Sequence, residues 1–247
     1  MNIESILQHQ VLAALYECCA PDFITAVKAT DILDTVVSCT SGDVTAFAAK
    51  DPASRGDAEF IARTYTSFKA VLHYRLAHAL VDARHAPHLP ADADMQAGII
   101  SNRGKIHSGA EIHHRCTIGR RFVLDHGIGT VVGETTQMGD DCYVLGGVTL
   151  GATGISGNPF GKRHPTLGNR VQVGSFARIF GPISIGDDVF IGPHCVIKDD
   201  LPANVIVTLK TEIQVTRRCS RPPTAYEPPH SSSQAASSRA RLEPSRP

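Results

Sequence analysis

The sequence lacks an excess of charge of either sign, because 24 basic side chains are balanced by 24 acidic ones among its 247 residues. Charge therefore gives no argument for binding nucleic acid or an anionic membrane. The sequence also lacks the apolar run of about 18 residues that a membrane-spanning helix needs, and its first segment, MNIESILQHQVLAALYECC, has no basic n-region. We predict no membrane span, no signal peptide and no nucleic-acid partner.

Cysteine pairs with CxxC spacing are absent too, although the chain has seven cysteines. Disulfide or metal-binding roles for these cysteines therefore have little support, and a reduced cytoplasm is the simplest setting. We predict a cytoplasmic protein.

What the sequence does contain is an apolar residue at every sixth position, interrupted by a two-residue slip and later by a longer break. This period fits neither an α-helix nor a long strand, but it fits a short strand followed by a tight turn. The series, in order, is Ile106, Ile112, Ile118, Leu124, Val132, Met138, Val144, Leu150, Leu167, Val173, Ile179, Ile185, Ile191 and Ile197.

Three strand-and-turn units of this kind make one coil of a triangular prism, and stacked coils supply the core that one coil lacks. A β-sandwich, the alternative, would place its strands about 8 to 12 residues apart. Glycine follows eight residues of the series, which we interpret as relaxing the corners. Cys116 and Cys195 fall on or near the inward side, as small hydrophobic residues do. The sequence predicts a parallel β-helix.

The chain as a whole is predicted to be α+β. Residues 1–97 form an α-helical domain, because apolar residues recur at helical spacing in IESILQHQVLAALYECC and SFKAVLHYRLAHALVDA. Asp51 followed by Pro52 is typical of a helix N-cap with proline at the first helical position. Residues 98–210 form the β-helix, and residues 211–247, rich in Pro, Ser and Arg, are predicted to be disordered.

The first interruption of the series, in LDHGIGTVVGET, holds Asp125 and His126. Regular coils need no insertion, and loops that leave a rigid scaffold often carry function. Glu111 lies fifteen residues before His126, close to one coil of about eighteen, so we predict that the two lie near one corner. A carboxylate beside an imidazole raises its basicity, as a general base acting on an alcohol requires.

The second interruption, LGATGISGNPFGKRHP, holds Arg163 and His164. A pair of this kind on a glycine-rich loop can clamp a carboxylate, the arginine doing so through two hydrogen bonds. The plainer alternative for Arg163 is a solvated loop charge. The alternatives for His126, Asp125 and Asp51 are a surface histidine, a carboxylate that bonds turn amides, and an N-cap alone.

Three further histidines, His107, His113 and His114, invite comparison with zinc sites built from imidazoles. Two adjacent histidines on a strand point to opposite faces, so these three are not expected to share an ion. We predict no metal site.

The ordered motifs LDHGIGTVVGET, GGVTLGATG and KRHP resemble the serine acetyltransferase family of hexapeptide-repeat acyltransferases, and KDPAS and SFKAVLHYRLAHAL resemble its helical amino-terminal domain. The resemblance covers residues 45–205 or thereabouts. It implies a left-handed β-helix, assembled as a homotrimer or a dimer of trimers with active sites between subunits. It also implies acetyl transfer from acetyl-CoA to the hydroxyl of L-serine, giving O-acetyl-L-serine for cysteine biosynthesis.

Position by position, the resemblance implies that His126 is the general base and that Glu111 stands where the family has the aspartate bonded to it. By the same match, Asp51 and Asp125 hold the serine ammonium group. The remaining matched positions are Arg163 and His164 for the serine carboxylate, and Ala152, Thr153 and Ser175 for the CoA arm.

Two alternative functions stay open at this point. Because the second loop, GISGNPFGKRHP, is longer than the family's, the acceptor could be another small amino alcohol in a specialised pathway. The scaffold could also be a non-catalytic β-helical assembly module. Family members that bind cysteine synthase do so through a terminal isoleucine, whereas this sequence ends in Pro-Ser-Arg-Pro, so we predict no such complex through the tail.

Overall fold

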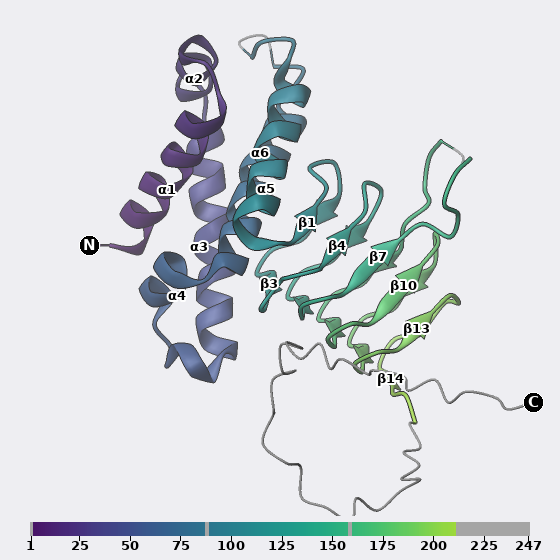
Figure 1. Ribbon diagram of the computed structural model, residues 1–247. Coiled ribbons are helices and arrows are strands. Elements are labelled where there is room, and N and C mark those ends of the chain that lie inside the picture. Colours follow the sequence, from purple (N-terminus) through teal and green to yellow (C-terminus); the bar gives the residue numbers. More distant parts are fainter. Residues whose placement is uncertain (1, 87–88, 158–159, 211–247) are drawn as a thin grey trace, which may run out of the picture. The chain divides into compact units, whose positions relative to one another are not determined.

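Helices come first and short strands follow in the computed structural model, which describes residues 2–86, 89–157 and 160–210 (Figure 1). Residues Met1–Leu209 form one compact unit. The predicted tail, residues 211–247, lies outside the described residues. The helices are α1 Ile3–Cys18, α2 Pro21–Lys28, α3 Ile32–Lys50, the 3-10 turn η1 Pro52–Ser54, α4 Ala58–Thr64, α5 Thr66–Asp82 and α6 Ala93–Ser108.

Helices α1 and α5 occupy the two segments with helical spacing, so both predictions are confirmed. The predicted cap is confirmed as well, although it begins the 3-10 turn η1: the Asp51 carboxylate accepts a hydrogen bond from the Ala53 amide at 2.9 Å. No helix among the described residues is long and apolar enough to cross a membrane.

Helix α6 corrects the start of the repeat series. The helix runs through the predicted boundary at residues 97 and 98 and ends at Ser108, where Gly109 adopts a left-handed backbone with φ of 72°. Ile106, predicted as the first inward residue of the prism, lies in this helix with 72% of its surface exposed. That prediction is wrong, because one matching position at the end of a series is compatible with either a helix or a coil.

The strands form three parallel sheets, one for each side of a prism, as the six-residue period predicts. All thirteen residues of the series from Ile112 onward are buried. The sheets are A (β1-β4-β7-β10-β13), B (β2-β5-β8-β11) and C (β3-β6-β9-β12-β14), and each coil passes through A, B and C in turn. The strand register places equivalent residues of successive coils above one another: in sheet A, Val132 pairs with Leu150, and Leu150 pairs with Ile179.

The strand bounds are β1 Glu111–Ile112, β2 Thr117–Ile118, β3 Val123–Leu124, β4 Val131–Val132, β5 Gln137–Met138, β6 Tyr143–Val144, β7 Thr149–Gly151, β8 Thr166–Leu167, β9 Gln172–Val173, β10 Arg178–Phe180, β11 Ser184–Ile185, β12 Phe190–Ile191, β13 Val196–Ile197 and β14 Ile206–Val207.

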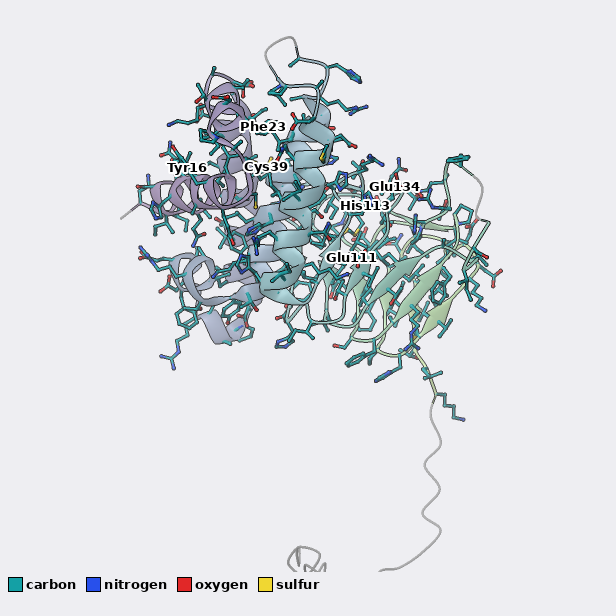
Figure 2. All side chains as sticks on the ribbon, turned by 45° about the horizontal axis from the view of Figure 1, so that its top comes forward. Tyr16, Phe23, Cys39, Glu111, His113 and Glu134 are labelled. Atoms are coloured by element: carbon teal, nitrogen blue, oxygen red, sulfur yellow. The ribbon has the colours of Figure 1, made fainter. Side chains whose placement is uncertain are left out.

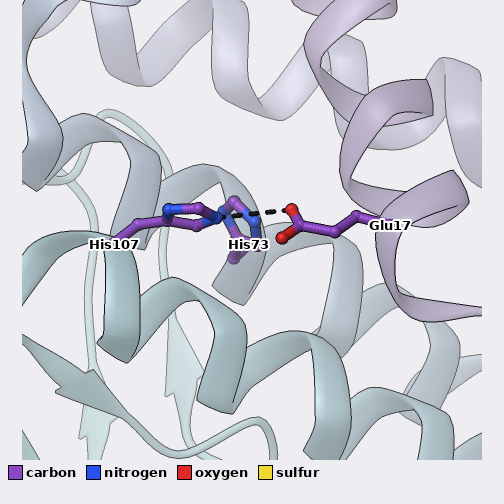
Figure 3. Close-up of side chains that lie close together, drawn as sticks. All are labelled: Glu17, His73 and His107. Carbon is purple, nitrogen blue, oxygen red and sulfur yellow. Dashed lines mark hydrogen bonds and ion pairs between the residues drawn. The ribbon is translucent and has the colours of Figure 1, made fainter.

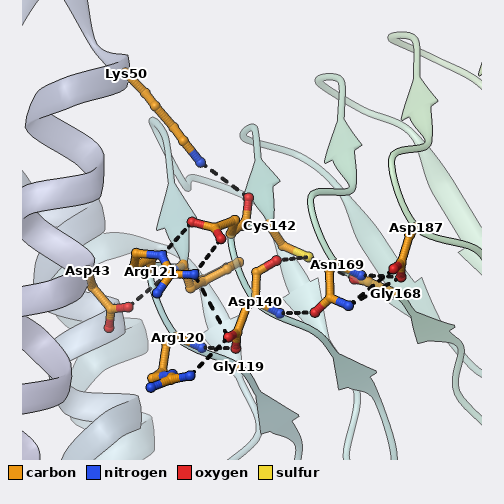
Figure 4. Close-up of polar contacts among 12 residues, drawn as sticks. Asp43, Lys50, Gly119, Arg120, Arg121, Asp140, Cys142, Gly168, Asn169 and Asp187 are labelled. Atoms are coloured by element: carbon orange, nitrogen blue, oxygen red, sulfur yellow. Dashed lines mark hydrogen bonds and ion pairs between the residues drawn. The ribbon is translucent and has the colours of Figure 1, made fainter. Parts of the chain in front are cut away.

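Glycines after the inward residues serve close approach rather than an unusual backbone angle. The Asn169 side chain accepts a hydrogen bond from the Asp140 amide at 2.9 Å (Figure 4). A Cβ on Gly139 would lie 2.5 Å from the Asn169 Oδ1. One coil further on, the Asp187 carboxylate accepts a hydrogen bond from the Asn169 backbone amide at 2.8 Å. These glycines leave room for a ladder of side chains that satisfies turn amides, so our interpretation of relaxed corners is wrong for them.

The two interruptions lie at different corners of the prism. The segment between a sheet C strand and the next sheet A strand is here called the C–A corner, and the one between sheets A and B the A–B corner. The two-residue slip lengthens the C–A corner between β3 and β4, which holds residues 125–130. The longer break lengthens the A–B corner between β7 and β8, which holds residues 152–165.

Candidate active site

His126 stands on the lengthened C–A corner, where its backbone is left-handed with φ of 59°. Such an angle is uncommon for a residue with a side chain, but regular corners of this β-helix adopt it too, at Phe176 with φ of 61° and at His194 with φ of 62°. Gly146, in the same corner of the next coil, lies beside His126: a Cβ on Gly146 would lie in ordinary van der Waals contact with the His126 Cβ, at 3.5 Å. The side chain is 80% exposed, which leaves its ring nitrogens accessible to a ligand.

An open cavity of about 520 Å³ adjoins His126 and brings two of the predicted carboxylates to it. Asp125 comes from the same corner, and Asp51 comes from the end of α3. The Asp51 carboxylate accepts a hydrogen bond from the Tyr65 hydroxyl at 2.7 Å, and that of Asp125 accepts one from the Tyr143 hydroxyl at 2.8 Å. Two anionic groups on one wall of a cavity favour a cationic ligand.

The two tyrosines act as donors that hold these carboxylates. The hydrogen bond to Asp51 raises the pKa of Tyr65 to about 12. Burial, and then the hydrogen bond to Asp125, raises the pKa of Tyr143. Both hydroxyls therefore stay protonated at neutral pH, and each donates its hydrogen bond to the carboxylate of a residue that lines the cavity.

Glu111 does not contact His126 in the described chain. Its carboxylate pairs with the Lys105 ammonium group of α6, while the His126 Nδ1 lies 3.8 Å from the Asp125 carboxylate. Glu111 is the first residue of β1, and its amide donates a hydrogen bond to the carbonyl of Thr130, the last residue of the lengthened C–A corner. Its assignment as the partner of His126 stays a prediction.

His164 is buried at the A–B corner and is oriented by Thr135. The Thr135 amide donates to the His164 Nδ1 at 3.2 Å, so the neutral ring carries its proton on Nε2. Burial, and then the nearby Arg163 charge, lowers the pKa of His164. A Cβ on Gly133 would lie 2.0 Å from this ring, so only glycine fits there.

Arg163 lies in the same A–B corner, and its positive charge is balanced by a carboxylate of the same chain. Its guanidinium pairs with Glu134, whose other oxygen lies 3.0 Å from Arg115. The bonds from Arg163 and then Arg115 lower the pKa of Glu134. Arg115 in turn pairs with Asp94 of α6. This chain of charges fixes where the guanidinium lies.

Figure 2 labels Glu111, His113 and Glu134 on the first two coils. The His113 and His114 rings stack with their centroids 4.5 Å apart, because both residues lie in the turn after β1 rather than on a strand. The prediction that they point to opposite faces is therefore wrong.

The positions matched to the CoA arm divide between the two corners. Ala152 and Thr153 directly follow β7 at the A–B corner, and a Cβ on Gly181 would lie 2.8 Å from the Thr153 hydroxyl. Ser175 is half-buried at the C–A corner, where its carbonyl accepts the His194 amide at 3.0 Å. These contacts do not assign a ligand to Ala152 and Thr153 or to Ser175, so their role along the CoA arm stays a prediction.

Eight of the nine predicted site residues, all except Glu111, thus divide into two half-sites at the two corners that flank sheet A. The first half-site comprises Asp51, Asp125, His126 and Ser175, and the second comprises Ala152, Thr153, Arg163 and His164. The strands of sheet A separate them within one chain. The structure joins Asp51, Asp125 and His126 around one cavity, and it does not join them to Arg163 or His164.

Four side chains that position these groups were missed by the sequence reasoning: Tyr65, Tyr143, Thr135 and Glu134. Thr135 and Glu134 lie within the motif GET of the first interruption, and that motif was the available signal. Tyr143 lies outside both interruptions, so no comparable signal marked it. Tyr65 lies fourteen residues from its partner Asp51, at a spacing without a local pattern.

The chain is similar to known transferases over most of its described length. The family model described as bacterial transferase hexapeptide (six repeats) matches residues 164–199. A serine acetyltransferase of Helicobacter pylori is 46% identical over 153 residues, covering 62% of this chain and 82% of that protein.

Two solved structures agree with this. Serine acetyltransferase isoform 3 of Entamoeba histolytica, in complex with cysteine, has a TM-score of 0.66 at 30% identity, covering 87% of this chain and 72% of that one. The Neisseria gonorrhoeae serine acetyltransferase in complex with serine has a TM-score of 0.68 at 27% identity, covering 85% and 83%. The predicted fold class, helices followed by a left-handed parallel β-helix of hexapeptide repeats, is confirmed.

Proposed function

The chain belongs to the serine acetyltransferase family of acetyl-CoA-dependent acyltransferases, and on that premise we propose how its own residues transfer the acetyl group to L-serine. The observation that carries the proposal is the cavity at the C–A corner, in which one exposed imidazole adjoins two carboxylates. An amino alcohol offers an ammonium group to the carboxylates and a hydroxyl to the imidazole. The products are O-acetyl-L-serine and CoA.

In this reaction His126 accepts the hydroxyl proton while the serine oxygen attacks the thioester carbonyl of acetyl-CoA. The C–O bond forms, the C–S bond breaks, and the proton taken by His126 is available to the departing thiolate. General base catalysis of this kind contributes about 10²- to 10⁴-fold to a rate. Asp51 and Asp125, each held by a tyrosine hydroxyl, fix the ammonium group so that the hydroxyl faces the ring.

The second half-site supplies the hydrogen-bond donors for the serine carboxylate, which the first half-site lacks. Arg163 and the Nε2–H of His164 are donors suited to the serine carboxylate. Since they lie across sheet A from His126, we infer that they come from a neighbouring copy of the chain. A cyclic trimer brings one edge of each copy against the other edge of the next, which places the first half-site of one copy beside the second half-site of its neighbour. Ala152 and Thr153 would then flank the CoA arm from the neighbouring copy, and Ser175 from the first.

The acceptor is tested by measuring thiol release from acetyl-CoA with L-serine, homoserine, threonine and amino sugars. We expect L-serine to give the highest kcat/KM, since the carboxylates and the Arg163 loop together match an amino acid. A higher kcat/KM with another amino alcohol would replace serine by that acceptor in the proposal. Thiol release with none of them would favour the non-catalytic module.

The division between copies predicts complementation between two damaged chains. His126→Ala and Arg163→Ala chains, co-expressed with different affinity tags and purified over both, form mixed trimers in which one interface pairs the two intact half-sites. We expect about one third of wild-type thiol release from such trimers, whereas each variant alone stays near background at low serine.

Mixed trimers of His126→Ala and Asp125→Ala chains are the matched control. Both changes lie in the first half-site, so every interface keeps one lesion and no recovery is expected. No recovery in the first mixture would show that His126 and Arg163 do not meet across copies. Recovery in the control would show that His126 and Asp125 of one copy do not serve the same site. Either result would leave the acceptor assay of the wild-type chain unaffected.

A further inference from the structure

Three side chains that could hold a metal ion converge in the helical domain, outside both half-sites. Glu17 is on α1, His73 on α5 and His107 on α6, and their ligand atoms all lie within 4.8 Å of one another (Figure 3). The His107 Nε2 is 3.3 Å from the Glu17 Oε2, and the two imidazole ring centroids are 5.4 Å apart.

His73 is oriented as a metal ligand would be. Its Nδ1 lies 2.7 Å from the Lys69 carbonyl, which accepts a hydrogen bond from the Nδ1–H, so that in the neutral ring the Nε2 lone pair is free. The residue is only 5% exposed, and its buried Nε2 has no hydrogen-bond partner among the described residues. A ligating histidine almost always donates its other N–H to such a carbonyl or to a carboxylate.

The backbone is built to bring these side chains together. A Cβ on Gly104 would lie 2.8 Å from the His73 Cβ, so glycine at this position lets α6 approach α5 closely. His107 follows three residues later on the same face of α6. Any larger residue at Gly104 would push the two imidazoles apart.

The cavity beside the cluster holds a second unsatisfied acceptor. Gln10 lines the same cavity of about 250 Å³ with Glu17, His73 and His107. Its Nε2 donates to the Ala62 carbonyl at 2.7 Å, whereas its buried Oε1 has no partner among the residues that the structure describes. An acceptor in that place suits a water molecule bound to a metal ion.

We propose that Glu17, His73 and His107 bind a divalent transition-metal ion of the Zn²⁺ class, with a water molecule at the fourth position. Two imidazoles and one carboxylate favour Zn²⁺, Co²⁺ or Ni²⁺ over Mg²⁺ and Ca²⁺, which prefer oxygen ligands. Tetrahedral zinc with bonds of about 2.0 to 2.1 Å places its ligand atoms about 3.3 Å apart, which the Glu17–His107 pair already matches.

The arginines around the cluster pair with carboxylate oxygens other than the one that would bind the metal ion. Arg103 pairs with the Glu17 Oε1 at 3.0 Å, so the Oε2 that faces His107 remains for the metal. Arg63, which also lines the cavity, is paired with Glu59 at 2.8 Å. Lys69 also lines the cavity and contributes a positive charge to its rim. The bound ion ties α1 to α5 and α6.

The test uses the full chain, stripped with a chelator and titrated with ZnCl₂ and CoCl₂. We expect one ion per chain by calorimetry, a higher Tm with Zn²⁺, and the visible absorption of four-coordinate Co²⁺. Binding to the native state alone raises its stability. His107→Ala, at an exposed position, is expected to fold and to weaken binding about 100-fold or more.

Two controls separate this site from others. His9→Ala removes an exposed histidine from the same domain and should leave the titration unchanged, and His126→Ala should do the same because His126 lies outside the cluster. Equal affinity in His107→Ala and the wild type, or no Zn²⁺ binding by the wild type, would overturn the proposal. Loss of binding in His126→Ala would move the site to the active-site cavity and overturn it as well.

Discussion

Replacing His126 with alanine is expected to lower kcat for acetyl transfer to L-serine by about 10²- to 10⁴-fold. The imidazole is the only basic side chain that the structure places beside the two carboxylates of the C–A cavity, among the residues that line it. Without it the serine hydroxyl must lose its proton to water during the attack on the thioester. The measurement is thiol release at saturating acetyl-CoA and serine.

The same variant should bind its substrates almost as the wild type does. Asp51, Asp125 and their tyrosines remain, so KM for serine is expected to change much less than kcat. His9→Ala is the matched control, because it removes an exposed histidine of α1 far along the chain from the cavity residues. Unchanged kcat in His126→Ala would favour the non-catalytic module or another base.

The β-helix was predictable because its period is a local property that the sequence repeats. Thirteen inward residues, from Ile112 to Ile197, follow one spacing rule, and each is buried. The rule failed at Ile106, where one residue fits a helix equally well. The role predicted for the glycines was also wrong. Gly139 is needed because Asn169 of the next coil occupies the space that a side chain would take. Contacts between coils are not visible in the six-residue period.

The candidate site was predictable in part, for a related reason. The interruptions marked His126 and Arg163, because an insertion in a regular series is visible without a structure. Which corner each interruption lengthens depends on how many strands precede it, so their separation by sheet A became clear only from the sheets.

The cluster of Glu17, His73 and His107 was not predictable at all. Its members lie 56 and 34 residues apart along the chain, on three helices. Only the packing of those helices brings them together. The predicted absence of metal rested on adjacent histidines and did not consider this combination.

The junction between helices and β-helix depends on a buried ion pair, and its loss is the second large effect that we expect. Arg75 of α5 bonds the Asp43 carboxylate through Nε at 2.8 Å and Nη2 at 3.0 Å, and its side chain is 8% exposed. The same guanidinium donates to the Ile118 and Gly119 carbonyls at 2.6 Å. Asp43 also accepts the Phe122 amide at 2.9 Å.

Arg75→Met should lower the free energy of unfolding by about 3 to 5 kcal/mol, because it leaves the Asp43 carboxylate buried without its cation. For a unit of about 200 residues this corresponds to a fall in Tm of roughly 6 to 20 °C. Urea unfolding at a fixed protein concentration measures it. The concentration must be fixed, since association of the chains would add to the apparent stability.

Arg170→Met is the matched control, because Arg170 makes an equally direct ion pair with Asp188 at the surface, with side chains 52% and 41% exposed. Solvent screening keeps the loss at this surface pair far smaller than the loss expected for Arg75→Met. Adding Asp43→Asn to Arg75→Met removes the unpaired charge while keeping an acceptor for the Phe122 amide. The double variant should therefore be more stable than Arg75→Met alone, and a sum of the two separate losses would contradict the role of the buried charge.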